Sequence, residues 1–305
     1  MELYKQTLDY FMGLQVETEH INDEIHIQQD INAFRSSLVY DCIERAMDLV
    51  EGGSVYSADG GPTAGTISAG DSLAALDEIV FNQKLLTMEQ VLHAMSTNYE
   101  DMETVPAGPE IRAILLNKAP KFGNDDERAD KWVVELEDYI GSSYRYKYRS
   151  SKYGKGPVPC CYSYSQSPVT GNIAFGKSIG ATPDGRKDGQ PVNNGISPAN
   201  GSEKKGATAA CNSVMKLPSI WFQKGAIFNM RLSKGALDTD ENKEKVIAMI
   251  KVLFENYGQQ IQFNVVDNKV FKKAMEHPDE YKDLMVRVSG YSALFTSLSR
   301  SARWM

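Results

Sequence analysis

The most reactive side chains in the sequence are the thiols of Cys42, Cys160, Cys161 and Cys211. Adjacent cysteines such as Cys160 and Cys161 rarely have the geometry of a structural disulfide. No histidine or basic residue directly flanks the pair to lower the pKa of either thiol. We therefore interpret the pair as incidental, with a radical relay or a redox pair as the alternative.

Other polar patterns resemble known sites but lack essential residues. The glycine-rich stretch 52–70 has neither the G-x-G-x-x-G fingerprint nor the glycine-lysine-serine/threonine of a phosphate-binding loop. The segment 238–249 begins like a calcium loop, but lysine and methionine stand where glycine and glutamate are required. His20, His26, His93 and His277 form no H-x-x-x-H pair for zinc. We expect no bound metal, and we interpret Asp125-Asp126 as a helix cap rather than paired catalytic acids.

The segment RVSGYSALF (287–295) is harder to explain as ordinary structure. Gly290 follows a strand-like run and precedes an apolar one. A glycine here indicates a turn that tolerates no Cβ atom. That constraint alone does not identify a function.

The first half of the chain reads as helical, because apolar residues recur at helical spacing. Thr87 and Gln90 have the spacing of a capping box. We expect helices over 1–35, 38–50, 73–84, 88–99, 111–119 and 127–146.

The second half differs in composition. Residues 154–212 are rich in glycine, proline, serine and asparagine, and such a long irregular segment usually has a functional role. Strand-type runs follow at 225–232 and 260–267, separated by a helix that we expect Asp240 to cap. A further helix over 268–284 and a strand-like end give a strand–helix–strand order, which predicts an α/β sheet or barrel segment.

Composition limits the remaining possibilities. The 305 residues allow one large or two small domains, and the net charge of −7 disfavours nucleic acid as a partner. No apolar run reaches membrane-spanning length, the N-terminus lacks the pattern of a signal peptide, and four cysteines are too few for a secreted disulfide scaffold. We expect a cytoplasmic protein that binds no membrane.

The motif RVSGY (287–291) resembles the signature of glycyl radical enzymes, the superfamily of pyruvate formate-lyase and of radical dehydratases, decarboxylases and lyases. The stretches FNVVD (263–267) and GNDD (123–126) favour the dehydratase-like branch. Four longer stretches carry the resemblance over nearly the whole chain: 70–92, 119–130, 177–217 and 261–295.

The resemblance implies that Gly290 stores a radical on its Cα atom, within a loop that also holds Arg287, Val288, Ser289 and Tyr291. With no side chain, that radical is planar and shares electron density with both flanking amides. The family implies an anaerobic radical lyase, dehydratase or formate C-acetyltransferase with no bound cofactor. A partner iron–sulfur activating enzyme removes the glycine hydrogen with S-adenosylmethionine, and a cysteine thiyl then takes hydrogen from a small organic substrate.

The resemblance also implies the fold. We expect the C-terminal part of a ten-stranded α/β barrel, its second half-barrel, with flanking helices. Residues 1–176 would belong to the pyruvate formate-lyase-like domain and 177–305 to the glycine radical domain, and the full-length protein would form a homodimer.

The sequence departs from the family in two ways. Family chains are far longer, with the thiyl cysteine on an upstream loop that none of the four cysteines here matches. They also continue past the radical loop with a helix, where this sequence has SRSARWM (299–305). We therefore expect a C-terminal fragment. The alternatives are a spare-part protein that restores a damaged lyase and a non-functional truncation; the substrate is not readable from these residues.

Overall fold

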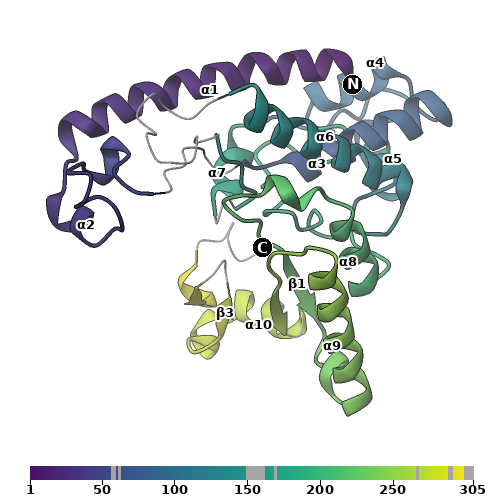
Figure 1. Cartoon of the computed structure of the whole chain (residues 1–305). Helices are drawn as coiled ribbons and strands as arrows, with labels where there is room; N and C mark the ends of the chain where they lie inside the picture. Colours follow the sequence, from purple (N-terminus) through teal and green to yellow (C-terminus); the bar gives the residue numbers. More distant parts are fainter. Residues whose placement is uncertain are drawn as a thin grey trace. The chain divides into compact units, whose positions relative to one another are not determined.

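A computed structural model shows the architecture of the chain (Figure 1). It describes residues 1–55, 60, 63–148, 162–167, 170–265, 268–287 and 291–298. The chain divides into two units, and each is described by itself. Unit 1 comprises Met1–Pro62, Glu137–Ser165 and Ile220–Lys224, and unit 2 comprises Thr63–Leu136, Gln166–Ser219 and Gly225–Met305.

Unit 1 is helical and contains a cluster of stacked tyrosines. The ring of Tyr144 stacks on that of Tyr162 with centroids 4.9 Å apart, and the Tyr164 hydroxyl donates to Glu137 Oε2 at 2.6 Å. Its elements are the long helix α1 (Glu2–Gln29), α2 (Ala33–Ser37), the 3₁₀ turns η1 (Leu49–Glu51) and η3 (Ser219–Trp221, which begins in unit 2), and the second half of α6 (Glu127–Tyr146).

Two helices expected in unit 1 differ from the structure. The predicted helix over 1–35 is interrupted after Gln29, and Asn32 caps the separate helix α2 by accepting from the Arg35 backbone N–H. The predicted helix over 38–50 is wrong, because Asp41 and Ala46 have positive φ angles of 79° and 51°. A right-handed helix cannot continue through left-handed residues, so this stretch is a series of turns.

Unit 2 begins with a helical layer. Gly65, with φ of 94°, precedes α3, whose last turn widens into a π-helix. The Thr87–Gln90 capping box is confirmed, since each side chain bonds the other residue's backbone N–H. Asp126 Oδ1 accepts from the Arg128 backbone N–H and caps α6 as expected. The helices are α3 (Thr66–Ala75), η2 (Leu76–Asn82), α4 (Met88–Ser96), α5 (Gly108–Asn117), the first half of α6, α7 (Gly171–Lys177) and α8 (Ala207–Met215).

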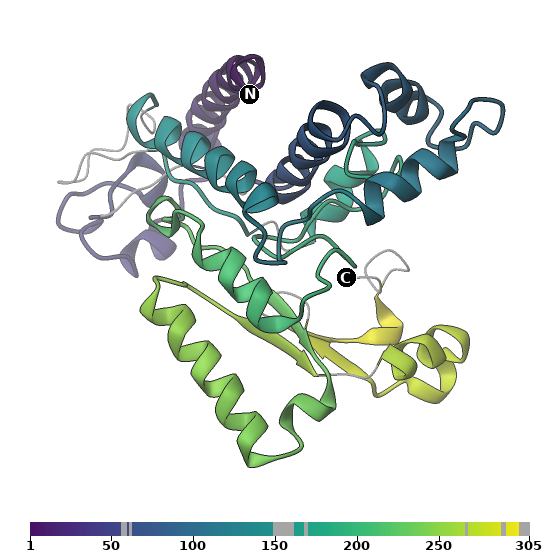
Figure 2. The same ribbon diagram turned by 90° about the vertical axis from the view of Figure 1, so that its right-hand side faces the viewer.

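A β–α–β element follows in unit 2, so the α/β class is confirmed. Strand β1 (Asn229–Leu232) pairs in parallel with β2 (Gln262–Val265), and α9 (Asp240–Glu255) connects them. Helices α8 and α9 run along this strand pair (Figure 2). The cap of α9 is Thr239 rather than Asp240, because the Thr239 hydroxyl accepts from the Asn242 backbone N–H.

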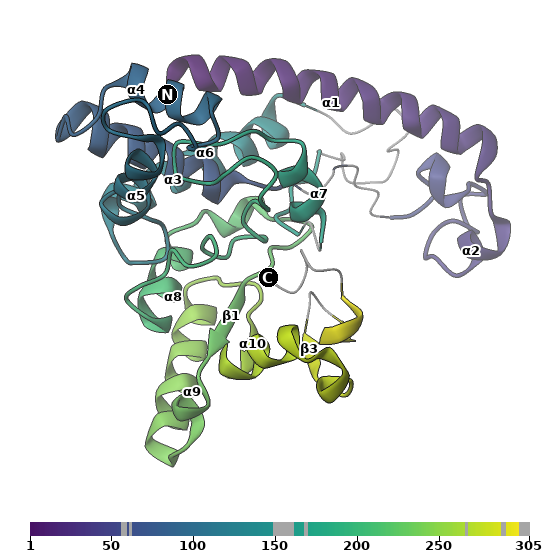
Figure 3. The same ribbon diagram turned by 180° about the vertical axis from the view of Figure 1, so that it is seen from behind.

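The last part of unit 2 is a small α/β cluster. Strand β3 (Met285–Arg287) pairs antiparallel with β4 (Ser292–Leu294), and α10 (Asn268–Glu276) lies next to β3 (Figure 3). Ala274, Val286 and Phe295 form its buried centre. Three 3₁₀ turns complete the unit: η4 (Lys234–Leu237), η5 (Pro278–Tyr281) and η6 (Phe295–Ser297).

Helix α1 has apolar residues on two opposite faces. Met12 and Val16 are buried within unit 1. On the opposite face a stripe of five apolar side chains, each 42–76% exposed, recurs every seven or four positions: Leu3, Tyr10, Leu14, Ile21 and Ile25. A contiguous exposed apolar surface of this kind marks an interaction face or a source of aggregation.

We predict that the 305-residue chain expressed alone associates through this stripe. Leu14→Glu combined with Ile21→Glu should shift the chain toward smaller species in analytical ultracentrifugation, with helix content unchanged by circular dichroism. Met102→Glu, which alters an exposed apolar side chain outside the stripe, is the matched control. A monodisperse wild-type monomer would contradict the prediction.

Candidate active site

An irregular segment, residues 178–206, forms one wall of the site and contains no helix or strand. Residues 184–186, 192–193 and 195–197 are nevertheless buried. Buried backbone groups must find hydrogen-bond partners, and this segment has no strand or helix ladder to supply them. Turn bonds such as that from the Gly185 N–H to the Thr182 carbonyl satisfy some of these groups, and the Ile196 N–H donates to the Ile227 carbonyl. Side chains from the segment and from the surrounding helices bond others.

Arg186 satisfies the largest group of carbonyls. Its side chain lies near the C-terminal end of α7, where unsatisfied carbonyl oxygens favour a cation. The planar guanidinium provides five N–H donors in a fixed arrangement. The carbonyl oxygens that accept from it belong to Gly176 (3.5 Å), Ile179 (3.1 Å), Gly180, Lys187 (3.1 Å) and Gln190 (2.6 Å).

Three further side chains bond the turn 182–186. The Tyr99 hydroxyl donates to the Thr182 carbonyl at 2.6 Å, and Arg112 Nε donates to the Gly185 carbonyl at 2.9 Å. Lys121, itself buried, donates to the Asp184 carbonyl at 2.8 Å. The turn 182–186, of sequence TPDGR, is therefore held by charged and polar groups from the helical layer of unit 2.

Two buried asparagines hold the rest of the segment. Asn124 Oδ1 accepts from the backbone N–H groups of Lys204 and Lys205, and its Nδ2 donates to the Ser202 carbonyl at 2.8 Å. Asn193 Oδ1 accepts from both the backbone and the hydroxyl of Ser68 on α3. These bonds fix the wall that contains residues 191–203.

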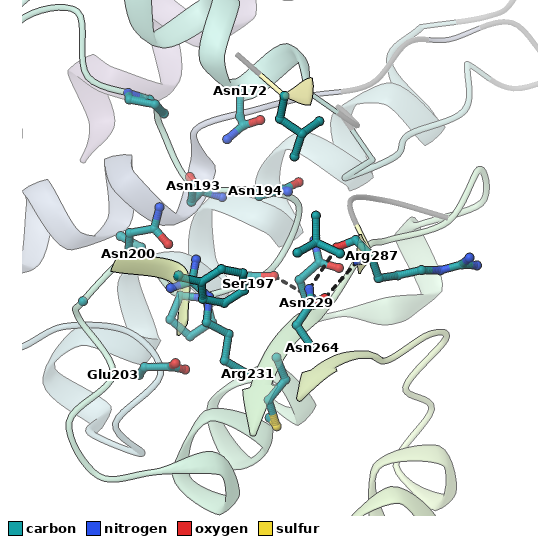
Figure 4. Close-up of a pocket in the computed structure, with 18 of the residues that line it drawn as sticks. Asn172, Asn193, Asn194, Ser197, Asn200, Glu203, Asn229, Arg231, Asn264 and Arg287 are labelled. Atoms are coloured by element: carbon teal, nitrogen blue, oxygen red, sulfur yellow. Dashed lines mark hydrogen bonds between the residues drawn. The ribbon is translucent and has the colours of Figure 1, made fainter. Parts of the chain in front are cut away.

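A cavity of about 390 Å³ lies between this wall and the strands of unit 2 (Figure 4). On β1, Asn229, Met230 and Arg231 all line the cavity; Met230 and Leu232 are buried, whereas Asn229 and Arg231 are more exposed. Strand alternation explains this arrangement, because every second side chain points to the same face. Asn264 lies opposite Arg231 in the register of the two strands, on the same face.

Carboxamides are the most numerous polar groups of the described lining, with six asparagines beside four charged residues. The charged lining residues on this side include Glu203 and Arg231, both exposed to the open cavity. Desolvation by the surrounding protein raises the pKa of Glu203, and the Arg231 charge opposes that shift. Asn194 also lines the cavity, and its Oδ1 is a buried acceptor without a hydrogen-bond partner among the described residues.

The predicted radical loop lies at the end of the β3–β4 hairpin. Arg287 and Ser292 are register partners, and Arg287 Nη1 donates to Ser292 Oγ at 3.3 Å. The Arg287 guanidinium extends away from the labelled asparagines (Figure 4), and Tyr291 is 46% exposed. The predicted site residues Val288, Ser289 and Gly290 lie outside the described residues, so their roles stay predictions.

Neither of the two described cysteines belongs to the residues of this hairpin. Cys42 in unit 1 and Cys211 in unit 2 are both buried free thiols. Burial raises the pKa of Cys211 to about 11, and burial with the Asp48 charge raises the pKa of Cys42. Cys160 and Cys161 lie outside the described residues. The described residues also bring no three histidine, cysteine, aspartate or glutamate side chains together as a metal site.

Asp71 on α3 is fully buried, and its pKa is raised to about 7 by that burial. Its Oδ1 accepts from the Phe122 backbone N–H at 2.7 Å, whereas Oδ2 has no hydrogen-bond partner among the described residues. The Lys121 charge and the Phe122 bond oppose the shift in pKa. The neutral carboxyl is therefore the stable form in the folded protein at acidic pH.

Comparisons with known proteins identify the family of this chain. The family model for pyruvate formate lyase-like proteins matches residues 1–175, and that for the glycine radical matches residues 192–296. "Probable dehydratase YbiW" of Escherichia coli is 35% identical over 305 residues, covering 99% of this chain and 37% of its own length. The chain belongs to the glycyl radical enzymes of the pyruvate formate-lyase-like superfamily.

Solved glycyl radical enzymes share the fold. A structure on 1,2-propanediol dehydration in Roseburia inulinivorans has a TM-score of 0.91 at 34% identity, and the glycerol dehydratase of Clostridium butyricum has 0.88 at 35%. Each match covers 99% of this chain and 37% of the relative. The chain thus spans just over a third of the length of these relatives, and the predicted domain boundary at 176/177 stays a prediction.

No helix in the described residues is long and apolar enough to cross a membrane.

Sequence reasoning missed polar residues that line the cavity beside the hairpin. Asn193, Asn229, Arg231 and Asn264 were not singled out, although a Phe-Asn pair occurs in both predicted strands. Alternation around these pairs places the asparagines on one face. That repeated pair is the signal from which a polar strand face could have been predicted.

We predict that Arg186→Lys destabilises the protein by about 2–4 kcal/mol, because lysine has three donors and no planar arrangement to replace the guanidinium. Arg128→Lys is the matched control, since Arg128 lies on the surface with Asp126 and Glu78, where ion pairs contribute little. Urea unfolding of both variants measures the difference. Equal midpoints for the two variants would show that the Arg186 bonds do not stabilise the segment.

We predict that Asp71 makes stability fall as pH rises from about 4 to about 7. In that window the folded protein keeps a proton that the unfolded chain, with a pKa near 3.8, has released. Asp71→Asn, which stays neutral, should gain stability relative to the wild type as pH rises through the window. Thermal unfolding at several pH values measures this, with the exposed Asp279→Asn as control. A stability difference that does not vary with pH would refute the prediction.

Proposed function

We propose that this chain provides the radical-storing part of a glycyl radical dehydratase or related lyase, with Gly290 as the radical residue. The observation that carries the proposal is the position of RVSGY (287–291). It lies within the glycine radical match, and its flanks pair as the β3–β4 hairpin beside the cavity. The hairpin base presents the loop on rigid strands, which suits a residue that must meet a reaction partner at a defined position.

The proposed chemistry consists of hydrogen-atom transfers. An activating enzyme removes one hydrogen atom from the Gly290 Cα, using S-adenosylmethionine and an iron–sulfur cluster. The glycyl radical then takes a hydrogen atom from a cysteine thiol, which leaves a thiyl radical. The thiyl takes a hydrogen atom from a carbon of the substrate, and the protein contributes position and the exclusion of water and oxygen.

The thiyl cysteine is expected outside these 305 residues. Cys42 and Cys211 are buried thiols, and neither lies in the part of the cavity lining that the structure describes. Cys160 and Cys161 are in no sequence context that resembles the thiyl loop. The relatives are nearly three times as long as the matched region, which leaves room for such a loop in the rest of a whole enzyme.

The substrate class follows from the relatives and from the cavity. The similar solved proteins are described by propanediol dehydration and by glycerol, both small hydroxylated compounds. Carboxamide side chains on the cavity wall can donate to and accept from hydroxyl groups without adding charge. We therefore propose dehydration of a small hydroxylated substrate in a cytoplasmic, anaerobic enzyme, with this chain forming the second half of its barrel and the whole enzyme forming a homodimer.

The test is the radical itself. In the full-length enzyme, treated anaerobically with its activating enzyme and S-adenosylmethionine, we predict a doublet organic-radical signal by EPR. Gly290→Ala should abolish this signal, because the added Cβ prevents a planar, accessible radical centre. Gly235→Ala is a matched control, because a Cβ there meets no atom closer than 3.7 Å. A signal of full intensity in Gly290→Ala would place the radical elsewhere.

A further inference from the structure

The Asn264 side chain bonds both backbone groups of one residue in the hairpin. Asn264 Nδ2 donates to the Arg287 carbonyl at 2.9 Å, and the Arg287 backbone N–H donates to Asn264 Oδ1 at 3.0 Å. Figure 4 shows the two contacts as dashed lines between β2 and β3. A carboxamide has the same donor and acceptor groups as a peptide unit, so this side chain replaces the backbone of a neighbouring strand.

Arg287 lies at the base of the predicted radical loop. It is the last described residue before the loop that contains Gly290, three positions further along the chain. On its other side it is the register partner of Ser292 in β4. The two backbone groups of Arg287 therefore bond Asn264, whereas its side chain bonds β4 through Ser292 Oγ.

Other directional contacts of the hairpin are within it, such as the bond from the Phe295 N–H to the Leu284 carbonyl at 2.7 Å, and its packing against α10 is apolar. The apolar cluster of Ala274, Val286 and Phe295 packs β3 against α10 and η6. Apolar packing is non-directional and does not by itself set a register. Strand β2, in contrast, is held in register with β1, and Gln262 Nε2 donates to Asn229 Oδ1 at 2.8 Å. Asn264 thus connects the loop base to the better-fixed part of the unit.

We propose that Asn264 is a positioning residue for the radical loop: its carboxamide fixes the base of the β3–β4 hairpin against β2 and thereby sets where Gly290 lies. The inference rests on the proposed function, because it assigns a role toward the Gly290 radical. Asn264 does not touch the reacting atoms in this role. It acts through the backbone of Arg287.

The two bonds predict different effects for different replacements. Alanine removes both bonds, whereas aspartate keeps the size and one acceptor but loses the donor to the Arg287 carbonyl. The second carboxylate oxygen then faces that carbonyl oxygen, which is unfavourable for both groups. Each lost bond corresponds to about a fivefold change in the equilibrium between a held and a released hairpin base.

The first measurement is hydrogen exchange at the hairpin of the full-length enzyme. We expect exchange of the Arg287 amide to accelerate about fivefold or more in Asn264→Asp and up to about 25-fold in Asn264→Ala. Asn256→Ala is the matched control, because Asn256 Nδ2 donates to the Val252 carbonyl at 2.8 Å on α9, away from the hairpin. Unchanged exchange in both Asn264 variants would overturn the inference.

The second measurement uses the activated enzyme. We expect both Asn264 variants to lower kcat at least fivefold with little change in KM, and to alter the line shape or yield of the Gly290 EPR doublet. Asn256→Ala should match the wild type in each. Wild-type kcat and an unaltered doublet in the Asn264 variants would overturn the positioning role while the proposed function stands. Absence of the doublet in the wild type would instead refute the proposed function itself.

Discussion

Unit 2 depends on one constraint: the buried backbone of the irregular segment 178–206 must be hydrogen bonded without a helix or strand. Arg186 contributes by donating to five carbonyl oxygens, four of them in this segment. Asn124 and Asn193 bond further groups, and backbone turn bonds such as that from the Gly185 N–H to the Thr182 carbonyl supply others. Each unmade bond in such a setting would cost about 1–3 kcal/mol. The helices α3 and α5 and the loops near them therefore present polar side chains inward, toward the segment.

This constraint connects the helical layer of unit 2 to the cavity. The wall 191–203 is held by Ser68 on α3 and by Asn124 just before α6, and the facing wall is the polar side of β1 and β2. A glycyl radical enzyme needs its reacting groups at fixed separations, since hydrogen-atom transfer requires close approach. A wall fixed by charged and amide side chains, rather than by apolar packing alone, gives that precision because its bonds are directional.

Asparagine side chains bond backbone groups at two places in unit 2, the base of the hairpin and the irregular segment. The asparagine carboxamide provides a donor and an acceptor, so it can replace a peptide group at Arg287 and bond the loop backbone at Ser202 and Lys204. It does so without adding a charge, whereas a buried carboxylate such as Asp71 has a strongly raised pKa. The six described asparagines of the cavity lining keep their polarity over a wide pH range, because amides do not titrate.

The sequence by itself determined the family, the candidate radical residue and most helices. RVSGY is a local signature, and caps such as Thr87 depend on residues only three positions apart. The β1–α9–β2 order was also predictable, because strand and helix periodicities differ locally. Only the tertiary structure shows that 38–50 forms turns, in which Asp41 and Ala46 take left-handed conformations. It alone also shows which backbone carbonyls the side chains of Arg186 and Asn264 bond. Those bonds depend on which backbone groups lie near a side chain after folding, and no periodicity in the sequence encodes that proximity.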